Sequence, residues 1–218
     1  MSIALFDLDN TLLADDSDYL WGCFLAEKGI VDSENYAYKN RIFYDQYKAG
    51  TLDIFEFLAF QLQPLASHPR KQLEAWREEF MAQKIQPVLL PKAQALINQH
   101  QSQGHLCVII TATNRFITEP ICRLYGVEHL IATEPEQDAQ GEYTGRVVGT
   151  PCFQNGKITR LEEWMRPRQL SLADSWFYSD SHNDLPLLRK VTHPTAVDPD
   201  DPLQREAQLQ GWPILSLR

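Results

Sequence analysis

The 218-residue chain has few cysteines, and the four that it has are scattered, at Cys23, Cys107, Cys122 and Cys152. None of them forms a Cys-x-x-Cys pair, and their number is far below that of a disulfide framework. The pattern therefore gives no support for a zinc ribbon, a dithiol redox centre or a disulfide-stapled fold. We expect buried, reduced thiols that pack as small apolar side chains.

Long apolar runs are also missing, since no stretch approaches the roughly 20 residues of a membrane-spanning helix. The first apolar run, residues 3–6, is too short for a signal-peptide core and has no basic flank. We therefore predict a soluble cytoplasmic protein with no membrane partner.

Positive charge is scarce, with 20 Lys and Arg against 29 Asp and Glu, a net charge of −9. Nucleic-acid binding requires a basic surface that neutralises phosphates, so we predict no nucleic-acid partner. An acidic protein that acts on an anionic substrate must concentrate positive charge in its site. A divalent metal and one or two Lys or Arg side chains would supply that charge.

What the sequence does contain is a series of short apolar runs that predict buried strands. They cover residues 3–6, 106–110, 129–132, 176–178 and 195–197. Helical patterns separate them, notably over 91–104 and over 115–125, where Asn114 is the expected N-cap. Strands that alternate with helices predict an α/β fold, a parallel sheet with helices on both faces.

Residues 15–87 break this alternation, because they are rich in aromatics and show no strand pattern. We interpret them as three or four helices inserted after the first strand. They form either a lid or a continuation of the core. The predicted organisation is a core domain of residues 1–14 and 88–218 and a helical cap domain of residues 15–87. Four glycines within 133–158 predict a β-hairpin or flap.

Two acids follow the first strand, in the segment Phe6-Asp7-Leu8-Asp9-Asn10-Thr11. A carboxylate is costly to bury unpaired, but at the carboxyl end of a parallel strand it can point into a cleft. Two acids so close repel each other unless a cation or a shared proton lies between them. A calcium loop and a solvated turn at the strand end remain alternatives for this segment alone.

A second acidic segment, Ser179-Asp180-Ser181-His182-Asn183-Asp184, follows the strand at 176–178. Mg²⁺ favours a few carboxylates together with waters and substrate phosphate. Asp7, Asp180 and Asp184 would provide such a site. The alternative is a turn that caps the following helix.

Two weaker signals complete the set. Thr111 ends the strand at 106–110, where a hydroxyl next to a helix start suits a phosphate oxygen, although an ordinary helix cap fits as well. Lys157 follows a glycine and would neutralise phosphate charge, or it is a solvated surface lysine. The segment before it is no phosphate-binding P-loop, since Ile158 replaces the required Ser or Thr.

In this order, the four segments resemble the motifs of the haloacid dehalogenase superfamily of phosphotransferases. Asp7 to Thr11 matches the first motif, Thr111 the second, Lys157 the third, and Asp180 with Asp184 the fourth. The resemblance spans the chain and includes the helical insertion, which is similar to the family's first type of cap on a Rossmann-like core. The fourth motif looks like that of the phosphoserine-phosphatase-like branch.

The resemblance implies a magnesium-dependent phosphatase that works through an aspartyl-phosphate. Asp7 would be the nucleophile, and Asp9 would protonate the leaving oxygen and then activate water. Thr111 and Lys157 would stabilise the phosphoryl oxygens. The metal ligands implied are Asp7, the backbone carbonyl of Asp9, Asp180 and Asp184. Asn183 would contact the substrate or hold the loop of the fourth motif.

The substrate implied is a small phosphorylated metabolite. Asp16 lies where phosphoserine phosphatases have a Glu that holds an ammonium group, and Trp21 offers an aromatic contact. A helix start decorated with acids is the alternative for Asp16. Phosphoserine needs a further cation for its carboxylate, and Arg41 is the one candidate in the insertion. Histidinol phosphate has no carboxylate that would need such a cation, and aromatic side chains suit its imidazole ring. We therefore take histidinol phosphate as the lead substrate.

Other functions stay open beside this one. Phosphoserine and phosphocholine or phosphoethanolamine are the alternative substrates. A catalytically silent binding protein on the same fold is the alternative outside the hydrolases, and a phosphotransferase with an acceptor other than water is the third. The sequence does not reveal the oligomeric state.

Overall fold

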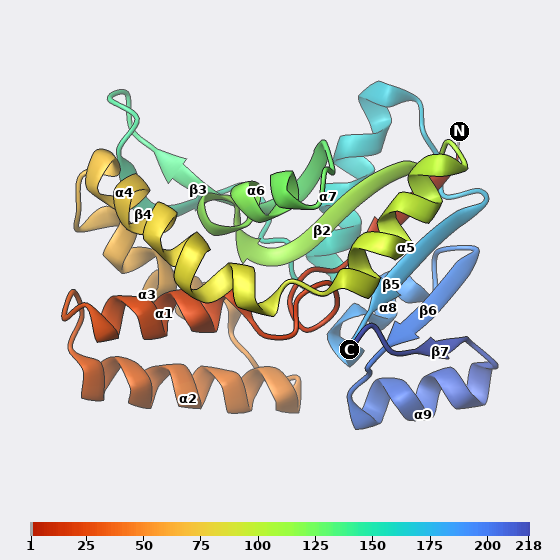
Figure 1. Cartoon of the computed structure of the whole chain (residues 1–218), viewed down its shortest axis with the longest axis horizontal. Helices are drawn as coiled ribbons and strands as arrows, with labels where there is room; N and C mark the ends of the chain where they lie inside the picture. The colour runs from red at the N-terminus through yellow and green to blue at the C-terminus, as the bar shows by residue number, and fades with distance from the viewer. Residues whose placement is uncertain (1) are drawn as a thin grey trace.

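The computed structural model describes residues 2–218, and its central element is one seven-stranded sheet with the order β4-β3-β2-β1-β5-β6-β7. Only β3 and β4 pair in antiparallel fashion. The prediction of an α/β fold with a largely parallel sheet is confirmed (Figure 1). The strands are β1 Ile3–Phe6, β2 Leu106–Asn114, β3 His129–Gln137, β4 Tyr143–Val148, β5 Ser175–Ser179, β6 His193–Val197 and β7 Ile214–Leu215.

Alternate residues of β1 belong to two separate hydrophobic clusters. Ala4 and Phe6 lie in one cluster, and Ile3 and Leu5 lie in the other. Since successive side chains of a strand point to opposite faces, both faces of the sheet are covered. The covering helices are α5 Pro91–Ser102, α6 Arg115–Leu124, α7 Asn155–Met165, α8 Leu185–Leu188 and α9 Asp201–Gln210.

The central position of β1 determines where a site can form. The chain goes from β1 to β2 on one side and later returns to β5 on the other side, so β1 borders a switch in strand order. In such sheets the crevice outside the carboxyl ends of these strands binds ligands. Asp7, which directly follows β1, lies at this point.

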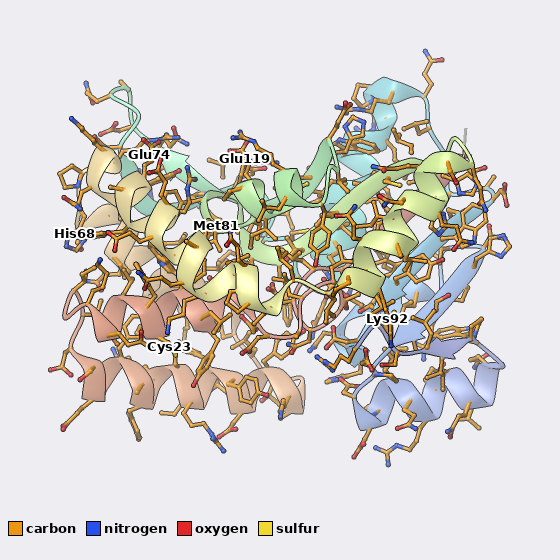
Figure 2. The ribbon with its side chains drawn as sticks, in the orientation of Figure 1. Cys23, His68, Glu74, Met81, Lys92 and Glu119 are labelled. Carbon is orange, nitrogen blue, oxygen red and sulfur yellow. The ribbon has the colours of Figure 1, made fainter. Side chains whose placement is uncertain are left out.

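Residues between β1 and α5 form the predicted helical insertion, which gathers on one side of the sheet in Figure 1. Its entry and exit are hydrogen-bonded to each other, since Leu13 pairs with Leu89 and Ala14 N donates to Val88 O over 2.9 Å. Figure 2 marks the insertion with Cys23, His68, Glu74 and Met81. Its helices are α1 Ser17–Glu27, α2 Ser33–Ala49, α3 Ile54–Ala66 and α4 Arg70–Phe80, followed by η1 Met81–Ile85 and η2 Gln86–Val88.

The insertion and the sheet's own helices share one hydrophobic cluster. Trp21 of α1 lies edge-on to Phe80 at 5.1 Å and to Phe116 of α6 at 5.7 Å between ring centroids. Leu58 and Leu62 of α3 belong to the same cluster. The helices near the sheet therefore pack as part of the core, while the connection at residues 14 and 88 marks the limits of the proposed cap.

The hairpin predicted for residues 133–158 is present only in its first part. Strands β3 and β4 form it, with Gly141 at the turn, and β4 ends at Val148. Helix α7 begins at Asn155, so Lys157 lies in the first turn of a helix rather than in a flap. The prediction was wrong here because it took the glycines as signs of turns, whereas Gly156 lies within α7. Two further elements, α9 and β7, were not predicted at all.

No helix among the described residues is long and apolar enough to cross a membrane.

The central strand provides a test of the fold. Leu5 is completely buried in β1. We therefore expect Leu5→Ala to lower the free energy of unfolding by about 2–5 kcal/mol, through lost burial and the cavity left behind. Urea denaturation measures this change.

The matched control for this variant is Leu209→Ala on α9. Leu209 is 81% exposed. Because an exposed side chain makes few contacts, its loss should change the free energy of unfolding by no more than about 0.5 kcal/mol. Equal losses in the two variants would contradict the placement of β1.

Candidate active site

The loop after β1 turns sharply, and this brings Asp7 and Asp9 to the same region. The backbone N–H groups of Leu12 and Leu13 both donate to Leu8 O, at 2.9 and 3.0 Å. Asn10 takes a positive φ of 57°. Asn tolerates this left-handed conformation better than most residues. Both carboxylates therefore lie at the carboxyl end of β1, close enough for each charge to affect the other.

Lys157 lies between two buried carboxylates. Its Nζ is 2.7 Å from Asp7 Oδ1 and 2.7 Å from Asp184 Oδ2, and the side chains of Lys157, Asp7 and Asp184 are 4%, 9% and 4% exposed. Ser179 Oγ also donates to Asp184 Oδ2 over 2.7 Å. The lysine is therefore not a solvated surface residue, since it joins the ends of β1 and β5 through one ammonium group.

The position of Lys157 depends on the residue before it. A Cβ at Gly156 would lie only 2.0 Å from Pro151 O, so no larger residue fits without movement of the backbone. Gln154, the residue at the N-cap of α7, has a positive φ of 48°. This tight entry into α7 directs the lysine of the first turn toward the end of β1.

Thr11 connects Asp7 with Asp180. Its Oγ1 is 3.3 Å from Asp7 Oδ2 and 3.0 Å from Asp180 Oδ1, and it accepts a hydrogen bond from Asp180 N over 3.0 Å. One hydroxyl therefore fixes the two loops that follow β1 and β5. The structure thus brings together Asp7, Asp180, Asp184 and Lys157, which are far apart in the sequence.

Asp9 is held by hydrogen bonds on both oxygens. Oδ1 accepts from Ser17 N, at the start of α1, over 2.7 Å, and Oδ2 accepts from Thr113 Oγ1 over 2.8 Å. Thr111 Oγ1 is 3.4 Å from the same Oδ2, and it accepts from Thr113 N. Thr111 therefore lies beside Asp9, but inside β2 rather than at a helix start, because the strand continues to Asn114. Thr113, two residues after Thr111, also belongs to the site, although the sequence analysis did not predict it.

Burial dominates the electrostatics of these acids. Burial raises the pKa of Asp7 from 3.8 to about 7, although the Lys157 charge acts in the opposite direction. Burial likewise raises the pKa of Asp9, and it raises the pKa of Asp180 well above its usual range, with Asp7 and Asp184 as like charges nearby. The buried acids therefore favour their protonated forms unless a further positive charge joins Lys157 in the cluster.

The donor set fits a hard divalent cation. Asp7, Asp180 and Asp184 offer only oxygen atoms, and when all three are ionised they would carry three negative charges against the single charge of Lys157. Among residues 2–218 no three or more His, Cys, Asp or Glu side chains are grouped closely enough to hold a metal ion as they stand. Mg²⁺ takes only a few carboxylates and completes its shell with water and phosphate.

A cavity opens beside these groups and extends under the insertion. Its lining from the sheet side includes Asp7, Asp9, Thr111, Lys157, Asn183 and Asp184. The insertion contributes side chains from α1, α2 and α3 and the segment before α3. They are Asp16, Asp18, Tyr19, Asn40, Phe43, Tyr44, Tyr47, Leu52, Ile54, Phe57 and Gln61.

Two of the predicted substrate-binding residues, Asp16 and Asn183, line the cavity and also make structural hydrogen bonds. Asp16 lines the cavity, but its Oδ1 accepts from Tyr19 N over 2.9 Å and so caps α1. Asn183 accepts from Gln154 Nε2 over 2.9 Å and donates to Tyr47 O over 3.2 Å. Asn183 thus holds the loop of the fourth motif against both α7 and the insertion.

Two predicted substrate contacts lie outside the cavity lining. Trp21 is only 1% exposed and packs among Phe24, Phe80 and Phe116, so its ring belongs to the core. Arg41 is exposed on α2, where it pairs with Asp45 one helical turn later over 3.2 Å. Aromatic and charged residues are spread over all faces of these helices, and packing alone decides which face meets the cavity.

Three buried polar residues of the insertion that line the cavity were not among the predicted site residues. Asp18 is 5% exposed, Asn40 6% and Gln61 2%. Asp18 is one of several acids at the start of the insertion, and its position there was the only available signal. Asn40 and Gln61 lie in the middle of helices, where an amide side chain indicates no particular chemistry.

The chain is similar to known proteins over nearly its whole length. Residues 4–189 match the family of haloacid dehalogenase-like hydrolases. A protein named histidinol-phosphatase from Neisseria meningitidis is 44% identical over 220 residues, covering 100% of this chain and 99% of its own length.

Solved structures agree with the fold. A protein of unknown function from Bordetella pertussis is 45% identical, with a TM-score of 0.93 and coverage of 100% of this chain and 99% of its own. A substrate-bound phosphoserine phosphatase has a TM-score of 0.72 at 17% identity, covering 100% of this chain and 93% of its own. At that identity the likeness concerns the fold alone.

The raised pKa of Asp7 predicts how stability depends on pH without metal. Because burial raises this pKa from 3.8 to about 7, the folded state binds a proton more tightly than the unfolded state does. The stability contributed by protonated Asp7 is fully present below about pH 4 and is lost as the pH rises through about 7. Asp7→Asn lacks this loss, so at pH 8 in chelator we expect it to be more stable than the wild type by on the order of 2 kcal/mol.

Denaturant unfolding of both proteins across this pH range measures the difference. The advantage of Asp7→Asn should shrink as the pH falls toward about 4, where the wild-type carboxyl is protonated. An advantage that is constant with pH, or a wild type that is more stable at pH 8, would contradict the raised pKa.

Proposed function

The chain belongs to the family of haloacid dehalogenase-like hydrolases and is a phosphatase of this family, and from that premise we propose that it hydrolyses histidinol phosphate. The observation that carries the proposal is the cavity, which joins the Asp7, Asp9 and Lys157 cluster to acids and aromatic side chains of the insertion. The relative from Neisseria meningitidis with this name supports the choice of substrate.

In the first step Asp7 attacks phosphorus, and the bond from phosphorus to the ester oxygen breaks, which leaves an aspartyl-phosphate. The Nζ of Lys157 lies 2.7 Å from Asp7 Oδ1. It orients the nucleophile and puts a positive charge beside the phosphoryl oxygens. The Thr111 hydroxyl lines the same part of the cavity and donates to a phosphoryl oxygen. The positions of these groups are fixed before substrate arrives.

Asp9 moves the protons. It donates a proton to the leaving alcohol oxygen, and in the second step it takes a proton from the water that attacks phosphorus and releases Asp7. Burial raises the pKa of Asp9, which favours the protonated form that this step needs. The hydrogen bonds from Ser17 N and Thr113 hold its carboxyl group in place for both transfers.

Asp7, Asp180, Asp184 and the backbone carbonyl of Asp9 would hold Mg²⁺. When bound, the ion supplies the positive charge that keeps the buried acids ionised and neutralises phosphoryl oxygens. Thr11 holds the Asp7 and Asp180 loops together for this purpose.

The charge of the cavity favours a substrate with a cationic tail and no carboxylate. Among the described residues that line it, Lys157 is the only one with a basic side chain, and it is already paired with two acids. When ionised, Asp18 in the cavity wall would repel the carboxylate of phosphoserine and attract an ammonium group. Phe43, Phe57 and other aromatic side chains suit an imidazole ring.

Residues 15–87 act in this proposal as a cap that excludes water from the reaction. Tyr47 of α2 donates to Ser181 Oγ over 3.1 Å, and Asn183 donates back to Tyr47 O. These contacts join the cap to the loop that carries Asp180 and Asp184. Movement of α2 away from this loop would admit substrate, and its return would restore the contacts.

Substitutions at Asp7 and Asp9 test the division of roles. We expect Asp7→Asn to lower kcat by on the order of 10⁴-fold or more, because no phosphoenzyme forms. Asp9→Asn should lower kcat/KM by about 10²–10⁴-fold for histidinol phosphate, whose alkoxide leaving group needs a proton. For an aryl phosphate the loss at Asp9 should be smaller, since a phenolate leaves more easily. Phosphate release measures both, with unfolding curves as the control.

A catalytically silent protein would release no phosphate from any ester, and that result would overturn the proposal. Full activity of Asp7→Asn, or of the wild type in excess chelator, would also contradict it. If Asp9→Asn lowered kcat/KM equally for histidinol phosphate and the aryl phosphate, Asp9 would not be the general acid.

A comparison of substrates tests the specificity. We expect kcat/KM for histidinol phosphate to exceed that for phosphoserine by at least about tenfold, a difference of about 1.4 kcal/mol in transition-state binding. Phosphocholine and phosphoethanolamine, which lack the ring, should fall below histidinol phosphate. Phosphoserine at or above the rate for histidinol phosphate would overturn the substrate assignment and leave the phosphatase activity in place.

A further inference from the structure

Two acids of the insertion line the cavity, and only one of them is free of a capping role. Asp16 is the N-cap of α1, where its carboxylate accepts from Tyr19 N over 2.9 Å. Asp18 lies inside the first turn of the helix and caps nothing. Within residues 2–218 its carboxylate accepts only one hydrogen bond, a long one of 3.4 Å from Asn114 Nδ2 to Asp18 Oδ1.

Asp18 is a deeply buried acid, with 5% exposure. Among residues 2–218 no Lys, Arg or His lies within ion-pair distance of its carboxylate. Burial raises the pKa of Asp18 well above its usual range, so the carboxyl ionises only when a cation reaches it. The cavity is the route by which such a partner arrives.

A second, independent feature lies next to Asp18. Asn40 is only 6% exposed, lines the cavity, and accepts from Gln61 Nε2 over 3.4 Å, while Gln61 Oε1 accepts from Tyr36 Oη over 2.8 Å. These two hydrogen bonds direct the Asn40 side-chain oxygen toward Gln61 and leave Asn40 Nδ2 without an acceptor among the described residues. Asn40 thus brings to the cavity wall an amide whose Nδ2 lies beside Gly22 of α1 and has no acceptor among residues 2–218.

Gly22 shows that Asn40 belongs to the same surface as Asp18. A Cβ at Gly22 would lie 2.6 Å from Asn40 Nδ2 and 2.5 Å from a ring carbon of Tyr36. Residues 18 and 22 are one helical turn apart on α1, so they share a face of the helix. A glycine in a helix costs about 1 kcal/mol relative to alanine, and here it makes room for Asn40 and Tyr36.

We propose that Asp18 and Asn40 form the subsite that recognises the nitrogen groups of the substrate, with Asp18 binding the ammonium group and Asn40 Nδ2 donating to an unprotonated ring nitrogen. The proposal rests on the proposed function, since it assigns residues to the substrate class that the cavity accepts. Asp16 then serves mainly as the cap of α1. A neutral imidazole offers one nitrogen as an acceptor, which matches the free donor of Asn40.

The test compares two substrates in each variant: histidinol phosphate and its desamino analogue, 3-(imidazol-4-yl)propyl phosphate. The quantity measured is the ratio of their kcat/KM values, which is independent of the fraction of folded enzyme. In Asp18→Asn we expect this ratio to fall by on the order of 30-fold, since a charge-assisted hydrogen bond is lost for one substrate only. Asp16→Asn, where Asn still caps the helix, is the matched control and should keep the wild-type ratio.

A ratio that is unchanged in Asp18→Asn, or that falls in Asp16→Asn instead, overturns the assignment of Asp18. If the wild-type enzyme hydrolyses neither ester, the proposed function itself fails. This outcome differs from a failure of the Asp18 assignment, because no ratio of kcat/KM values can then be measured.

For Asn40 the variant is Asn40→Asp, which replaces the donor with an acceptor. It should reduce kcat/KM for both imidazole esters by about tenfold relative to phosphoethanolamine, which has no ring. Equal effects on all three esters would show that Asn40 has only a structural role, and this would overturn its assignment to the subsite.

Discussion

The ammonium group of Lys157 is the constraint on which the site depends. It lies 2.7 Å from carboxylate oxygens of Asp7 and Asp184, which follow different strands. Buried ion pairs add little net stability, because desolvation of the charges offsets their attraction. The value of this arrangement is geometric, since it fixes a nucleophile that would otherwise repel its acidic neighbours. Gly156, Thr11 and Ser179 can each be understood as parts that hold this arrangement in place.

Helix α1 couples catalysis with specificity. Its first backbone N–H group, from Ser17, holds Asp9, and one residue later Asp18 faces the cavity. The proton donor and the proposed amine receptor therefore meet at one helix turn. A movement of the insertion that displaces α1 would disturb both, so closure over the correct substrate would also complete the catalytic geometry. The contacts of Tyr47 with the loop of Asp180 and Asp184 act in the same direction.

The features that could be predicted from the sequence are those that follow from the topology of a parallel sheet. Apolar runs located the principal strands, and acids after the strands at 3–6 and 176–178 had to meet at one edge. Helix α5 and the Asn114 cap of α6 were also predicted from local signals. Lys157 was predicted in the site, yet its helix was missed because the neighbouring glycines suggested a hairpin.

Features set by contacts distant in sequence could not be predicted. Trp21 turns toward the core and Arg41 toward solvent, and only packing distinguishes these faces from the one with Asn40 and Gln61. The pattern of aromatic, charged and amide residues along these helices is the same whether a side chain meets the core, the cavity or water.

Trapping the phosphoenzyme tests most directly whether Asp7 carries the phosphoryl group. Enzyme mixed with histidinol phosphate and Mg²⁺ is quenched in acid within one turnover and reduced with borohydride, which converts an aspartyl-phosphate into homoserine. Peptide mass spectrometry then locates the change. We predict homoserine at position 7 in the wild type and none in the same enzyme incubated without substrate. Unmodified Asp7 under conditions of rapid turnover, or homoserine at Asp9 or Asp180 instead, would contradict this role.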